Sequence, residues 1–87
     1  MVMAQEQGTV WRCSVDGLDR LVELNEAMRG APVCDVWYDK TAEGSAKMRL
    51  WAADHDGSYC RPRAEQLIAS LQNWGWSCEM LTPPETP

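Results

Sequence analysis

Short segments whose side chains alternate between two faces constrain the fold of this chain most strongly. In "TVWRCSV", Trp11, Cys13 and Val15 would share one face of an extended chain, while Arg12 would lie on the other. A repeat of two residues is typical of β-strands with one buried face. The pattern predicts four strands, at residues 9–15, 33–40, 46–52 and 76–82.

Two further segments repeat at helical spacing. In "DGLDRLVELNEAMRG", Asp16 can cap the start of a helix, and the apolar stripe consists of Leu18, Leu21, Val22, Leu24 and Met28. In "CRPRAEQLIASLQNWG", Pro62 occupies the first turn, where a missing N–H costs nothing. Its stripe consists of Ala64, Leu67, Ile68, Leu71 and Trp74. We therefore expect helices over residues 16–30 and 60–75.

The resulting order, β-α-β-β-α-β, predicts an α+β fold of the ferredoxin-like type. Right-handed crossovers would place both helices on one face of a four-stranded antiparallel sheet with strand order 4-1-3-2. With 87 residues the chain makes one domain, which we expect to span 9–82. Residues 1–8 and the Pro-rich residues 83–87 are expected to be flexible.

The two middle strands are expected to form a hairpin with the loop Ala42-Glu43-Gly44. Directly opposed residues of two paired strands lie on the same face of a sheet. Aligning the polar face of one strand with the polar face of the other therefore fixes which residues pair. Gly44 would supply the left-handed residue that such a loop needs. The expected pairs are Asp39 with Lys47, Trp37 with Arg49, and Asp35 with Trp51.

Composition narrows the classes of function. Thirteen acidic against eight basic residues give a formal charge of −5, which disfavours direct binding of nucleic acid, since that depends on basic residues. An acidic surface suits docking onto a basic patch of another protein. The start of the chain has no pattern of a signal peptide, and no apolar run is long enough for a membrane span. We therefore expect a cytoplasmic protein.

The four cysteines follow no metal-binding spacing. Cys13, Cys34, Cys60 and Cys78 include no C-x-x-C pair. Because thiols stay reduced in the cytosol, we expect free thiols in the core, with disulfides and a structural zinc site as the alternatives. No metal and no cofactor is expected.

The segment "WAADHDGSYC" holds the only histidine and resembles a reactive site. Asp54 and Asp56 match two positions of a calcium-binding loop, but the closing glutamate is replaced by Arg63. His55 and Cys60 supply two zinc ligands where four are needed. A hydrolytic or metal-dependent enzyme centred on Asp54, His55 and Cys60 is therefore an alternative, and a polar turn before the second helix is the preferred interpretation.

The polar face of the sheet is the preferred candidate site. Tryptophan and arginine are enriched among the residues that dominate binding energy, and exposed aromatic side chains on an uncovered sheet are typical of an interface. Val10 and Leu81 would add apolar area, and Glu79 would lie at the rim. The candidate partner-binding residues are Arg12, Asp35, Trp37, Asp39, Lys47, Arg49 and Trp51.

These features predict a small acidic protein-binding module without catalytic activity. The RNA-recognition signature, the C-x-x-C loop of metallochaperones and the Gly-rich loop of acylphosphatases are all missing. Inhibitors from phages and mobile elements, including anti-CRISPR proteins, form one such class, which block the basic groove of a host nucleic-acid-handling complex. A homodimer that buries the same sheet face is the second alternative.

Overall fold

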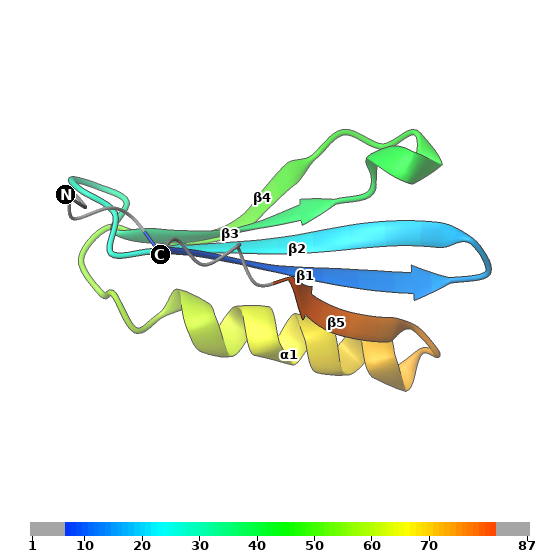
Figure 1. The fold of residues 1–87 in the computed structure, drawn as a ribbon. Helices are drawn as coiled ribbons and strands as arrows, with labels where there is room; N and C mark the ends of the chain where they lie inside the picture. The colour runs from blue at the N-terminus through cyan, green and yellow to red at the C-terminus, as the bar shows by residue number, and fades with distance from the viewer. Residues whose placement is uncertain (1–6, 82–87) are drawn as a thin grey trace, which may run out of the picture.

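The computed structural model describes residues 7–81, which form a five-stranded sheet and one long helix (Figure 1). The elements, in chain order, are β1 (Gln7–Val15), β2 (Leu18–Glu26), β3 (Cys34–Asp39), the short 3-10 helix η1 (Thr41–Glu43), β4 (Met48–Ala53), α1 (Cys60–Asn73) and β5 (Ser77–Leu81). Strand β1 thus includes Gln7 and Gly8, and the remaining residues of the predicted terminal segments lie outside the described range.

All neighbouring strands are antiparallel, in the order β4-β3-β2-β1-β5. Helix α1 lies against one face of this sheet and leads into β5, which joins the sheet beside β1 (Figure 1). The broad α+β class agrees with the sequence prediction. The ferredoxin-like β-α-β-β-α-β order is wrong, because the sheet has five strands and a single long helix covers it.

The difference arises in the segment predicted as the first helix, which forms strand β2. Asp16 and Gly17 have φ angles of 50° and 83°, and Val15 pairs directly with Leu18. A two-residue hairpin turn needs positive φ at both central residues, and Asp-Gly is a preferred pair for it. The chain therefore reverses at Asp16-Gly17 into a second strand. Pairing with β1 and β3 outweighs the helical propensity of the Leu, Glu and Arg residues that follow.

The core lies between α1 and the covered face of the sheet. Alternate residues near the middle of the central strands are buried there, as Trp11, Val22, Leu24 and Val36 show. Helix α1 contributes Ala64, Ile68 and Leu71 from one side, as predicted. Trp74 was expected to complete that stripe, but it follows the last helical residue and is 68% exposed. The core set is Trp11, Cys13, Val22, Leu24, Cys34, Val36, Cys60, Ala64, Ile68 and Leu71.

A one-residue irregularity in β4 changes which residues face the core. Trp37 pairs with Arg49 as predicted, but Val36 pairs with Trp51, so Leu50 is an extra residue in the ladder. A bulge of this kind reverses the alternation beyond it. The predicted pair of Asp35 with Trp51 is therefore wrong, and Asp35 lies opposite Ala52. At the hairpin tip, Gly44 has φ 84°, the left-handed conformation that the sequence predicted.

All four cysteines are paired, which overturns the expectation of free thiols. One disulfide, the edge disulfide, joins Cys13 of β1 to Cys78 of β5. The other, the buried disulfide, joins Cys34 of β3 to Cys60 at the start of α1. Each bond connects the strands β1–β4 to the C-terminal unit of α1 and β5. Small domains that bury a limited core commonly depend on such links.

Arg20 binds the hairpin tip to the rest of the sheet. Its guanidinium donates two hydrogen bonds to Glu43 of η1, at 2.7 and 2.9 Å, and one to Tyr38 Oη at 2.9 Å. The same group stacks on Trp76, with 4.2 Å from Cζ to the ring centroid. These hydrogen bonds hold the pKa of Glu43 below its ordinary value and raise that of Arg20.

Replacing Glu43 with glutamine should therefore reduce stability at neutral pH and have less effect in acid. A carboxylate whose folded pKa is lowered adds stability that is complete above its unfolded pKa, about 4.3, and is lost as the pH falls through the folded value. Urea denaturation at several pH values measures the difference between wild type and Glu43→Gln. The loss caused by Arg20→Gln should also shrink in acid, but the part due to its contacts with Tyr38 and Trp76 should remain. A difference between wild type and Glu43→Gln that stays constant with pH would contradict the ion pair.

Within residues 7–81, no helix is long and apolar enough to cross a membrane.

Candidate functional site

The face of the sheet opposite α1 carries most of the predicted partner-binding residues. Along β1, Val10, Arg12 and Ser14 alternate with the buried Trp11 and Cys13, and strand pairing brings side chains of β2, β3 and β5 beside them. We call this surface the open face. It consists of Val10, Arg12, Ser14, Asp19, Leu21, Glu23, Asn25, Asp35, Trp37, Asp39, Lys47, Arg49, Ser77, Glu79 and Leu81.

Trp37 lies in β3, between Glu23 of β2 and Arg49 of β4. Lys47 Nζ lies 5.4 Å from the centroid of the Trp37 ring, and Arg49 Cζ lies 6.0 Å from it. Both distances allow attraction between a cation and the π face of an indole. The ring is partly exposed, so a partner could contact its free area and the two cations together.

Each basic side chain of the open face has an acidic neighbour. Arg12 pairs with Glu79 across β1 and β5, and Lys47 Nζ lies 2.8 Å from Glu23 Oε1. Arg49 approaches Asp35 more loosely, at 3.8 Å. Asp35 is 4% exposed and also accepts a hydrogen bond from Asn25 Nδ2 at 2.8 Å, so its carboxylate stays satisfied in a nearly dry position.

Two acidic residues have no such neighbour. Asp19 accepts a hydrogen bond from Ser14 Oγ at 2.8 Å, and Asp39 accepts one from the Thr41 N–H at 2.9 Å. The ion pairs found within residues 7–81 include neither carboxylate. Hydrogen bonds from Thr41, with a smaller contribution from the charge of Lys47, hold the pKa of Asp39 below its ordinary value. Because neither carboxylate forms an ion pair within residues 7–81, each can accept a cationic group of a partner.

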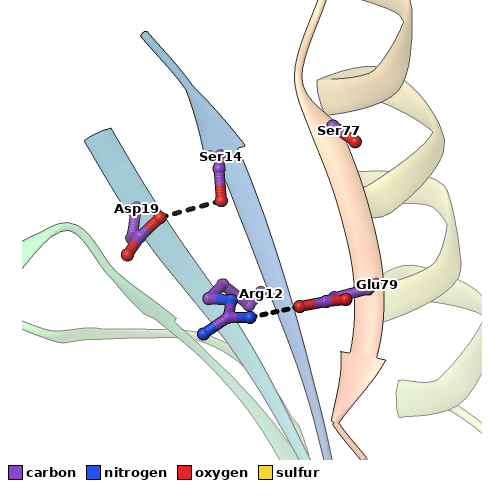
Figure 2. Close-up of a pocket in the computed structure, with 5 residues that line it drawn as sticks. All are labelled: Arg12, Ser14, Asp19, Ser77 and Glu79. Carbon is purple, nitrogen blue, oxygen red and sulfur yellow. Dashed lines mark hydrogen bonds and ion pairs between the residues drawn. The ribbon is translucent and has the colours of Figure 1, made fainter. Parts of the chain in front are cut away.

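Two adjacent depressions lie on this face, with volumes of about 400 and about 340 Å³. Figure 2 shows the first, where Ser14 bonds to Asp19 and Arg12 bonds to Glu79. Arg12 and Asp19 also line the second depression. Its remaining walls combine the apolar Leu21, Ala42 and Leu81 with the polar Asp39 and Thr41. The hollow part of the open face is thus polar at one end and partly apolar at the other.

Of the seven predicted site residues, the structure places six on the open face and moves one away. Arg12, Asp35, Trp37, Asp39, Lys47 and Arg49 lie together as expected. The position expected for Trp51 is wrong, since Trp51 pairs with Val36 and packs against the core on the covered face. The physical reason is the extra residue Leu50, which reverses the alternation of β4.

The sequence missed the contribution of β2. Asp19, Leu21 and Glu23 supply the centre of the open face, although the helix prediction assigned Leu21 to a buried stripe. The dipeptide Asp16-Gly17, between two runs that alternate, was the signal for a hairpin. With that turn, the odd-numbered residues of β2 fall on the same face as Arg12 and Trp37.

The alternative site around Asp54, His55 and Cys60 is not assembled. The sulfur of Cys60 is bonded to Cys34, so it offers no thiolate. Asp54 and His55 are exposed, while Asp56 accepts hydrogen bonds from the Ser58 N–H and hydroxyl at 3.0 and 2.7 Å. This is the geometry of an Asx turn. No group of three or more metal-binding side chains occurs within residues 7–81.

Comparison with known proteins adds no relationship, since no family model, curated protein or solved structure matches the chain.

Proposed function

We propose that this protein is a binding module that docks through its open face onto a basic surface of another protein. The observation that carries the proposal is the position of Trp37, partly exposed in the sheet face that α1 leaves uncovered. Antiparallel sheets can keep one polar face in water without any partner. Here, however, Val10, Leu21 and Leu81 add partly exposed apolar area to that of Trp37.

Charge favours a basic partner. The five carboxylates of the open face outnumber its three basic side chains, and the bases are already paired with acids of the same face. Asp19 and Asp39 stay available, and both line the second depression together with Leu21. A lysine or arginine of a partner could place its aliphatic stem on Leu21 and its charge between the carboxylates. Complementary charge of this kind raises association rates and selects partners.

The compartment proposed from the sequence needs revision. A cytoplasmic protein was expected from the lack of a signal-peptide pattern and of a long apolar run, and free thiols were expected to follow from that compartment, but each cysteine is paired. Disulfides that hold a small domain together favour an oxidising compartment. We therefore prefer a basic protein surface met outside the reducing cytosol. The alternative partner for the same open face is a cytoplasmic nucleic-acid-handling complex, which is the class that the sequence suggested.

A matched pair of tryptophan substitutions tests the proposal. Trp37→Ala should weaken binding of a purified partner by about tenfold or more, since a buried tryptophan at an interface centre typically contributes at least 2 kcal/mol. Trp74→Ala removes the same side chain from the end of α1, where it is 68% exposed, and should leave affinity unchanged. Partners are first captured with the oxidised wild-type protein, identified, purified and measured by calorimetry with all three proteins.

The outcomes separate the competing interpretations. Binding through the open face should also weaken with salt and with Asp19→Asn or Asp39→Asn, because a screened or missing carboxylate attracts a basic surface less. Equal affinity of Trp37→Ala and wild type, with both folded, would exclude docking at the open face. Light scattering of the wild-type protein alone, over a range of concentrations, would reveal a dimer that Trp37→Ala abolishes if a second copy is the partner.

A further inference from the structure

The two disulfides differ in their distance from solvent. Cys13, Cys34 and Cys60 have no exposed surface, whereas Cys78 is partly exposed in β5. Exchange between a thiol and a disulfide requires a thiolate to reach one sulfur of the pair, so access governs which bond reacts. Only the edge disulfide includes a cysteine that is partly exposed.

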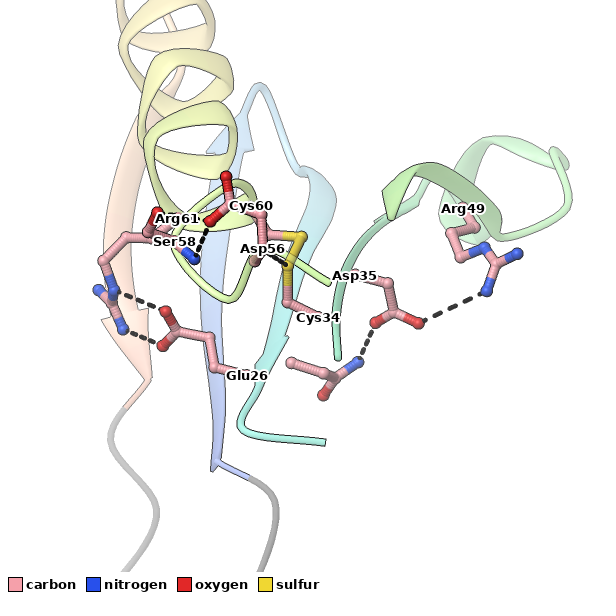
Figure 3. Close-up of a disulfide and its surroundings, with 9 residues drawn as sticks. Glu26, Cys34, Asp35, Arg49, Asp56, Ser58, Cys60 and Arg61 are labelled. Carbon is pink, nitrogen blue, oxygen red and sulfur yellow. Dashed lines mark hydrogen bonds and ion pairs between the residues drawn. A yellow bond between two sulfur atoms is a disulfide. The ribbon is translucent and has the colours of Figure 1, made fainter. Parts of the chain in front are cut away.

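The buried disulfide is shielded by two further contacts, both visible in Figure 3. The carbonyl oxygen of Asp56 lies 3.7 Å from Cys34 Sγ, so the turn before α1 covers that sulfur. Beside Cys60, Arg61 donates hydrogen bonds of 2.6 and 3.1 Å to both carboxylate oxygens of Glu26 and holds the start of α1 on β2. A reductant can reach this bond only after the turn and the helix end have moved.

Strand β5, by contrast, is held at one side only. It is an edge strand that pairs with β1 from Val10–Leu81 to Ser14–Ser77, and no strand lies on its other side within residues 7–81. The Cys13–Cys78 bond lies inside this short ladder. The same strand supplies Ser77, Glu79 and Leu81 to the open face, including both depressions.

We propose that the edge disulfide is a redox-sensitive covalent link between β5 and β1. A dithiol reductant breaks this bond while the buried disulfide stays intact. A thiolate of the reductant attacks Cys78 Sγ, and Cys13 leaves as a thiolate that takes a proton from water. The second thiol of the reductant, as its thiolate, then attacks the reductant sulfur in the mixed disulfide, and Cys78 leaves and is protonated. Two cysteine thiols form, and the dithiol is oxidised to a cyclic disulfide.

Opening this bond leaves β5 held by the short ladder to β1, the Arg12–Glu79 ion pair and its packing against α1. Local opening is easiest at edges with few packed neighbours, so β5 should separate from β1 far more often once the covalent link is gone. Each separation breaks the Arg12–Glu79 ion pair and removes Leu81 from the open face. A consequence for partner binding rests on the proposed function, whereas the order of reduction does not.

Timed reduction with dithiothreitol tests the order without any partner. The oxidised protein is incubated in native buffer, quenched with N-ethylmaleimide and mapped by mass spectrometry. Labelling of Cys13 and Cys78 should proceed about tenfold or more faster than labelling of Cys34 and Cys60, because burial of both sulfurs suppresses exchange. Equal rates, the reverse order, or four free thiols before any reductant is added would each overturn the proposal.

Hydrogen exchange on the partly reduced protein separates local release from unfolding. Amides of β5 should exchange about tenfold or more faster after the edge disulfide opens, while those of β2 and β3 keep their protection. Simultaneous loss of protection in β2, β3 and β5 would mean that reduction occurs through global unfolding, and the proposal fails. Cys13→Ala/Cys78→Ala should reproduce the exchange pattern of the partly reduced protein, and Cys34→Ala/Cys60→Ala should retain protected β5 amides until dithiothreitol is added.

Discussion

Removal of both disulfides is expected to leave the domain largely unfolded at about 37 °C. The two bonds join residues that are 65 and 26 positions apart in the sequence. Closing loops of these lengths contributes on the order of 3–4 kcal/mol each by restricting the unfolded chain. Small domains have a total stability of only about 5–15 kcal/mol, so the two contributions together are comparable with the whole.

The measurement is urea denaturation of the oxidised protein and of a variant with all four cysteines replaced by alanine. Each two-alanine variant should fall between them, because one closed loop remains. The amplitude of the far-ultraviolet circular dichroism signal at zero denaturant reports how much of the quadruple variant is folded. An unchanged urea midpoint in the quadruple variant would show that the disulfides do not support the fold and would restore the expectation of free core thiols.

Leu24→Ala should lower the free energy of unfolding by about 2–5 kcal/mol, while Leu18→Ala should cost less than about 1 kcal/mol. Leu24 has no exposed surface at the centre of β2, whereas Leu18 begins the strand and is 40% exposed. A helix over residues 16–30 would have placed both leucines on the same buried stripe. The pair of variants therefore discriminates between the strand and the helix at this segment.

Both variants keep the disulfides, so urea denaturation of the oxidised proteins gives the comparison directly. A matched pair of leucines removes the difference in side-chain chemistry and leaves only burial. Equal losses at the two positions would contradict the alternation of β2 and favour a helical segment. A large loss at Leu18 alone would contradict the hairpin turn at Asp16-Gly17.

The sequence correctly predicted the strands and the helix in which all local sequence signals indicate the same secondary structure. The sequences of β1, β3 and β5 alternate between two sets of residues, and α1 combines a buried stripe with Pro62 in its first turn. Strand β2 was missed because its leucines fit helical spacing as well as alternation, and only strand pairing decides between the two. This one assignment changed the predicted topology within the α+β class, since an extra strand replaces a helix.

The candidate site was predicted where alternation holds and missed where it breaks. Trp37 and Arg49 lie opposite each other because the hairpin from Asp39 to Met48 follows the parity read from the sequence. Trp51 lies on the other face because a bulge has no signature in a run such as "MRLWAA". The pairing of cysteines also depends on which strands are neighbours, so the sequence alone left it open.

The bulge at Leu50 affects the edge of the sheet as well as the core. Strand β4 lies at an edge of the sheet. A regular edge strand presents a row of unpaired backbone N–H and C=O groups, with which an extended segment of another chain can pair. The bulge interrupts that row, and Lys47 and Arg49 add charge beside it. Strand addition between copies is thereby discouraged at β4, which protects the protein from aggregating through this edge.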